Sequence, residues 1–173
     1  MPSRRAVIAG AGSLALAGLG GGVAWSRSVG TGRLYHKSIS VLDERNGRRY
    51  SFNIATLMYA DSSQRVIGDL VEELADAYNP PTSLHIGPEL QEQLSEQFEE
   101  VDYPLTFETN GRIGGRVPPS DFNQVSLGDE VEMLAYDWLD IDANNRVVGV
   151  TDREPAISEK DVTTHPLAEA YPE

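Results

Sequence analysis

Alternating apolar and polar residues predict two antiparallel hairpins. The first covers residues 34–58 and turns at Asn46-Gly47, the dipeptide favoured in a two-residue type I′ turn. With that turn, apolar residues face each other across the strands: Val41 opposite Phe52, and Ile39 opposite Ile54. The second hairpin covers residues 125–152. A turn at Asn144-Asn145 places Ile141 opposite Val148 and Leu139 opposite Val150.

Helical periodicity predicts two helices between these hairpins. In residues 63–78 the apolar positions recur at helical spacing: Val66, Ile67, Leu70, Val71, Leu74 and Tyr78. A second helix is expected over residues 88–100, because Pro88 suits a first helical turn. After it, residues 105–109 alternate like a short strand, and the Gly- and Pro-rich residues 110–119 are expected to form a loop.

The order of these elements predicts an α+β fold, in which antiparallel hairpins pack with two helices. An apolar signal or anchor helix is expected to precede the domain. Four segments result: a signal or membrane anchor over residues 1–25, a linker over 26–33, a single α+β domain over 34–153, and a polar C-terminal tail over 154–173.

The charge of the chain is strongly acidic, with 27 Asp and Glu against 14 Lys and Arg. The only lysines are Lys37 and Lys160. Carboxylates hold water and cations, whereas long lysine stems add apolar surface that concentrated salt drives together. This composition therefore favours a halophilic source. It disfavours a nucleic-acid partner, because nucleic-acid binding depends on cationic contacts to phosphate.

The chain has no cysteine. This excludes disulfides, thiolate metal sites, cysteine nucleophiles and thioether lipid anchors.

The first residues resemble a twin-arginine export signal. The motif comprises Ser3, Arg4 and Arg5, followed after one residue by the apolar Val7 and Ile8, and a weakly apolar run extends to residue 25. The resemblance covers only this segment. It implies that the twin-arginine translocation machinery carries the folded protein to the extracytoplasmic side. Cleavage and retention as a membrane anchor remain alternatives, since about twenty residues span roughly 30 Å as a helix.

A D-x-D-x-N pattern suggests one metal site. Asp140, Asp142 and Asn144 alternate like the oxygen ligands of a calcium-binding EF-hand loop. The pattern departs from that loop at Asn145, where glycine is expected, and at Thr151, where a bidentate glutamate is expected. The alternative is an ordinary hairpin with acids on its solvent face, with no cofactor.

A small cationic cluster is formed by Arg112 and Arg116. These arginines could contact a carboxylate or another acidic partner. The surrounding glycines lack the Lys-Ser/Thr of a phosphate loop. The three histidines, His36, His85 and His165, do not have the spacing of a zinc site.

These patterns favour an exported, non-enzymatic accessory or binding domain at the outer face of the cell envelope, with an envelope protein as a potential partner. Contact with the membrane is expected only through the N-terminal segment. One alternative is a small extracytoplasmic enzyme that uses His85, Tyr103 and the Arg112/Arg116 segment. The other is a calcium-binding module that uses Asp140, Asp142 and Asn144.

Overall fold

The computed structural model describes most of the chain from residue 28 onward: residues 28–60, 63–79, 82–108, 112–135, 145–153 and 159–170. The predicted signal or anchor helix and the predicted calcium ligands lie outside these ranges. Among the described helices, none combines the length and the apolar character needed to cross a membrane.

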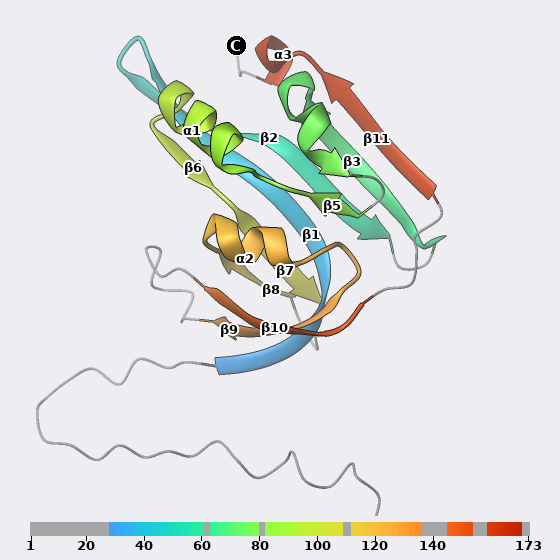
Figure 1. Cartoon of the computed structure of the whole chain (residues 1–173). Coiled ribbons are helices and arrows are strands. Elements are labelled where there is room, and N and C mark those ends of the chain that lie inside the picture. The colour runs from blue at the N-terminus through green and yellow to red at the C-terminus, as the bar shows by residue number, and fades with distance from the viewer. Residues whose placement is uncertain are drawn as a thin grey trace, which may run out of the picture.

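The described part of the chain has mixed α/β content and consists mostly of strands (Figure 1). Nine strands form the main sheet, whose central path runs β10-β9-β1-β2-β3-β11. The strands on this path are β1 (Ser28–Arg45), β2 (Arg48–Ala60), β3 (Arg65–Val71), β9 (Glu130–Ala135), β10 (Arg146–Asp152) and β11 (Glu159–His165). The others are β6 (Glu100–Asp102), β7 (Pro104–Glu108) and β8 (Arg112–Arg116), and a separate small ladder joins β4 (Tyr78–Asn79) to β5 (Ser83–Leu84).

Strand β1 is shared by both halves of the sheet. It pairs antiparallel with β2, β6, β7 and β9. Arg33 pairs with Glu108 of β7 and also with Glu130 of β9, so these two strands lie on opposite edges of β1. Residues 36–45 of β1 belong to one half of the sheet, with β2, β3, β6 and β11, and residues 28–37 belong to the other half, with β7 to β10 (Figure 1).

The first hairpin is confirmed, with β1 and β2 paired from His36 and Met58 to Arg45 and Arg48. Asn46 and Gly47 have positive φ values of 54° and 73°, as a type I′ turn requires. Val41 pairs with Phe52 as expected, but Ile39 pairs with Ala55, because the register shifts beyond Ser40. Residues 28–33, expected to be a linker, are instead the start of β1, where pairing with β9 satisfies their backbone groups.

The helix predicted over residues 63–78 is wrong. This segment contains β3 followed by a 3₁₀ helix, η3 (Glu72–Ala77). The apolar spacing of Val66 and Leu70 also fits a strand, and β2 and β11 on either side provide hydrogen-bonding partners. Gly68 gives a second reason why this segment is not a helix. Its φ of +154° is not helical, and residues with a side chain rarely adopt it.

The helix expected over residues 88–100 is confirmed as α1 (Pro88–Gln97), which begins at Pro88 as predicted. Leu94 and Phe98 from its apolar stripe are buried. The strand expected over residues 105–109 is confirmed as β7, one residue earlier in the chain.

The Gly- and Pro-rich loop predicted over residues 110–119 is wrong over most of its length. Residues 112–116 form β8, whose backbone pairs antiparallel with β7. The prolines then begin α2 (Pro119–Gln124), a short helix that the sequence patterns did not predict. Proline is favoured at the start of a helix, because the N–H groups of the first turn have no acceptor within the helix and the missing N–H of proline breaks no hydrogen bond.

The second hairpin is confirmed as an antiparallel pair, but its predicted register is wrong. Val150 of β10 pairs with Val131 of β9, and Val147 pairs with Met133. Arg146 pairs with Leu134, and a two-residue turn at Asn144-Asn145 would not produce this register. The segment expected as strand from residue 125 becomes β9 only at Glu130.

The C-terminal tail expected over residues 154–173 contributes a strand to the sheet. β11 runs parallel to β3, with Glu159 opposite Arg65 and His165 opposite Val71. A short helix, α3 (Leu167–Ala170), follows and contacts β2. Parallel pairing with a distant strand has no local sequence signature, which explains why composition alone indicated a tail.

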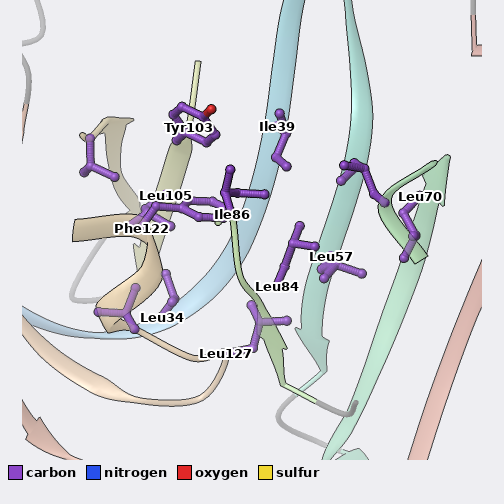
Figure 2. Packing of buried hydrophobic residues seen from close by; sticks show 14 of the residues in the cluster. Leu34, Ile39, Leu57, Leu70, Leu84, Ile86, Tyr103, Leu105, Phe122 and Leu127 are labelled. Carbon is purple, nitrogen blue, oxygen red and sulfur yellow. The ribbon is translucent and has the colours of Figure 1, made fainter. Parts of the chain in front are cut away.

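The buried core joins both halves of the sheet to the helices. Figure 2 shows Leu105, Ile86 and Phe122 gathered together, although they come from β7, the segment before α1, and α2. Leu57 and Leu70 extend the same cluster over β2 and β3. The region around α1 and α2 is thus held by the same core as the sheet.

Gly68 provides a test of the corrected strand. A Cβ atom at this position would meet the carbonyl oxygen of Thr56 in β2, whereas a Cβ at Gly149 in β10 would meet nothing within 4 Å. We expect Gly68→Ala to lower the free energy of unfolding by more than about 2 kcal/mol, because both backbone strain and overpacking oppose it. Gly149→Ala should stay within about 0.5 kcal/mol of the parent. Denaturant unfolding at constant salt measures both, and equal stabilities would contradict the assignment of β3.

Candidate binding cleft

A cleft of about 340 Å³ lies between α1, β6 and the segment that joins β8 to α2. Its lining combines polar and apolar side chains, among them Gln91, Phe98, Glu100, Asp102, Tyr103 and Arg116. The elements that form it follow from the fold: α1 packs beside β6, and the pairing of β7 with β8 brings residue 116 opposite residue 104. The cleft is therefore built on regular elements.

Arg116 is held within the cleft by two carboxylates. Its Nη1 lies 2.9 Å from Glu100 Oε1, and its Nε lies 3.1 Å from Asp102 Oδ2. An arginine already paired with two acids has little remaining attraction for an anion. The expected contact of Arg116 with an acidic partner therefore finds no support in this geometry. The backbone of Arg112 begins β8, and its side chain lies outside the described part of the structure.

Asp102 and Tyr103 both have shifted acidity. Burial raises the pKa of the Asp102 carboxyl, Arg116 opposes this shift, and Glu100 adds to it. Burial also raises the pKa of the Tyr103 hydroxyl, and the charge of Asp102 adds to that shift. Tyr103 therefore stays protonated well above neutral pH and keeps both a donor and an acceptor on its hydroxyl group.

Tyr103 has a buried ring and an unpaired hydroxyl group. The side chain is 5% exposed, and its ring centroid lies 5.4 Å from that of Phe122. Its carbonyl oxygen accepts a hydrogen bond from the N–H of Val117, which fixes the backbone against the opposite wall. Tyr103 lines the cleft, and no described residue forms a hydrogen bond with its hydroxyl group. This is the polar group in the cleft that a ligand would most readily satisfy.

A buried lysine lies behind Tyr103 and supports the position of Phe122. Lys37 in β1 is fully buried, and its Nζ lies 4.1 Å from the centroid of the Phe122 ring. The ammonium group donates hydrogen bonds to three carbonyl oxygens: Leu84 at 3.2 Å, Phe122 at 2.9 Å and Val125 at 2.8 Å. Burial lowers the pKa of Lys37 to about 7, while the charge of Asp129 acts in the opposite direction.

Helix α2 is fixed by two further polar contacts. The side-chain amide of Asn123 accepts from the N–H of Ile86 and donates to its carbonyl oxygen, each at 2.8 Å. Asp121, which is buried, accepts from Arg146 Nε at 2.8 Å and from the N–H of Val147 at 2.9 Å. A helix of six residues has little stability of its own, so these contacts and Lys37 determine where it lies.

The structure brings together only some of the residues considered for an enzyme. Tyr103 and Arg116 meet in the cleft, as that alternative requires. His85 is exposed and does not line the cleft, and its backbone N–H binds the carbonyl oxygen of Ala77. His36 lies half-buried in β1, where burial lowers its pKa, and His165 ends β11. The histidines thus belong to three separate elements.

The predicted calcium site cannot be placed, because Asp140, Asp142 and Asn144 fall outside the described residues. The neighbouring Asn145 is buried, and its N–H donates to the carbonyl oxygen of Arg116 at 2.9 Å. Within the described ranges, no group of three His, Asp or Glu side chains is arranged to hold a metal ion.

Sequence reasoning missed two components of this region. Glu100 and Asp102 lie two residues apart, which places both on one face of a strand, but their short segment gave no strand signal. Only a weak pattern indicated a structural role for Lys37: it is one of only two lysines and occurs within an alternating strand. Its burial depends on carbonyl groups from distant parts of the chain, which no local pattern reveals.

No protein-family model, curated protein or solved structure matches the chain.

The lowered pKa of Lys37 predicts how stability depends on pH. Between the pKa of about 7 in the folded state and the ordinary value of 10.5, the unfolded chain binds more protons, so the free energy of unfolding should rise with pH. We expect a slope of up to about 1.4 kcal/mol per pH unit between pH 7 and about pH 9.5. Lys37→Met should remove this slope, whereas Lys160→Met should retain it. Urea unfolding at several pH values and constant salt provides the measurement, and equal slopes for Lys37→Met and the parent would contradict the prediction.

Proposed function

We propose that the chain is an exported, non-enzymatic binding domain that acts at the outer face of the cell envelope of a salt-adapted organism. The cleft beside Arg116 is its ligand site. Export rests on the resemblance of Ser3, Arg4 and Arg5 to a twin-arginine signal. The N-terminal segment is the expected route to the membrane, with the twin-arginine machinery as a transient partner and an envelope protein as a potential lasting one.

The binding role is supported by a cleft of about 340 Å³ lined by Tyr103, whose hydroxyl group has no hydrogen-bond partner among the described residues. Ligand sites commonly combine a concave surface with a few fixed polar groups. The charged groups of this cleft are held in ion pairs, since Arg116 contacts both Glu100 and Asp102, and together these three side chains carry one net negative charge. A site of this kind can orient a ligand through hydrogen bonds. The exposed His85 is absent from the lining, which favours binding over histidine-based proton transfer.

The acidic composition supports a role outside the cell in concentrated salt. In molar salt the Debye length falls to roughly 3 Å, so repulsion among 27 acidic residues is screened. Recognition under these conditions depends on short-range contacts within a shaped site. The cleft offers such short-range contacts through its polar and apolar lining side chains.

The export signal can be tested by conservative substitution. We expect Arg4→Lys together with Arg5→Lys to leave nearly all of the protein in the cytoplasm, because the resemblance depends on the arginine pair. Arg27→Lys, outside the motif, should leave export unchanged. Cell fractionation with mass spectrometry of the intact chain measures both location and cleavage. Normal export of the double variant would refute the twin-arginine route.

The ligand site can be tested by filling the cleft. Gln91 lines the cleft, whereas Gln93 is exposed on the same helix outside it. The isotope-labelled full chain is titrated with a dialysable extract of the native cell envelope, and amide chemical shifts are followed by NMR. We expect the extract to shift resonances of residues around the cleft. Gln91→Trp should abolish these shifts, and Gln93→Trp should retain them.

Two outcomes would count against the cleft as the site. One is the absence of any shift around the cleft in the parent chain. The other is an equal response from Gln91→Trp and Gln93→Trp, which would place the ligand elsewhere. Thermal unfolding of both variants provides the necessary check that each remains folded.

A further inference from the structure

The geometry points to a neutral, polyhydroxylated ligand, such as a sugar ring, as the occupant of the cleft between α1 and β6. This inference rests on the proposed function, because it specifies the ligand class of the same site. Three properties of the cleft lead to it: its mixture of donors and acceptors, its internal ion pairs and its size.

The cleft offers hydrogen-bond donors and acceptors side by side. The Tyr103 hydroxyl can both donate and accept, as can the side-chain amide of Gln91, while Glu100 and Asp102 add acceptors and Arg116 adds donors. A sugar hydroxyl also donates and accepts, so neighbouring hydroxyls can satisfy both kinds of group. A carboxylate ligand provides only acceptors, and its negative charge would lie beside those of Glu100 and Asp102.

The charges of the cleft are already paired inside the protein. Arg116 contacts Glu100 and Asp102, and Glu99 is paired with Arg49 at 2.8 Å. A charged ligand would have to compete with these pairs, and concentrated salt would screen its attraction to the site. A neutral ligand can bind while all of these ion pairs stay in place.

The size and the walls of the cleft also suit a small ring. Its volume of about 340 Å³ lies near the lower end of the roughly 300–1,000 Å³ typical of ligand pockets. Pro118 and Pro119 line one wall beside Arg116 and provide apolar surface for the C–H face of a ring. Tyr103 lines the same space, and its hydroxyl group has no partner among the described residues.

Matched probes can test the charge and the chemistry of the ligand. Glucose, glucosamine and glucuronate share one ring and are neutral, cationic and anionic at mildly acidic pH. Galactose and mannose extend the neutral set. Each is titrated into the isotope-labelled full chain in dilute and in concentrated KCl, with amide shifts followed by NMR. We expect at least one neutral hexose to shift resonances around Gln91, Tyr103 and Arg116, with an affinity that changes little with salt.

A single hydroxyl deletion supplies the control. Tyr103→Phe should weaken binding of that hexose roughly three- to tenfold, the effect of one lost hydrogen bond. Tyr50→Phe, which removes a hydroxyl outside the cleft, should leave the affinity unchanged. A salt-independent interaction that Tyr103→Phe weakens supports the inference.

Two NMR results would contradict the inferred ligand class. If no neutral hexose shifts the cleft resonances, or if only glucosamine or glucuronate does so, the inferred ligand class is wrong. The proposed binding role would survive that result if the envelope extract still shifted the cleft resonances and Gln91→Trp abolished the effect. Failure of both experiments would remove the cleft as a binding site altogether.

Discussion

The ammonium group of Lys37 is the interaction on which the region outside the sheet depends. It is fully buried and donates to the carbonyl oxygens of Leu84, Phe122 and Val125, all of which lie far from Lys37 in the chain. Removing a charge from water is costly, and these carbonyls offset part of the cost only when Leu84 and the end of α2 lie against β1. One side chain thus couples β5, α2 and the loop after α2 to the central strand.

This coupling extends to the cleft through contacts between rings. Lys37 lies over Phe122, and the Phe122 ring packs against Tyr103, which lines the cleft. Tyr103 is held from the other side by Val117, next to Arg116. The position of the hydroxyl is therefore set by buried groups, which limits the entropy that ligand binding must overcome. A rigid cleft of this kind supports selective binding better than a mobile loop would.

Local signals predicted the elements that depend on local chemistry. Asn46-Gly47 specified the first turn, and Pro88 specified the start of α1. The spacing of Val66 and Leu70 fits either a helix or a strand, and only the distant partners β2 and β11 decide between them. Sequence reasoning placed Tyr103 and Arg116 in one candidate site, but their acidic neighbours Glu100 and Asp102 are brought there by pairing with β1, which is not visible locally.

The pairing of β1 with β9 has a consequence for the order of events during synthesis. Ser28 pairs with Ala135, so the first half of β1 leaves the ribosome long before its partner exists. Until then the strand has an unpaired edge and the apolar Leu34 lacks its final packing. Closure of this half is a late, long-range step with a high loop-closure cost. The proposed export of the folded chain would have to follow this step.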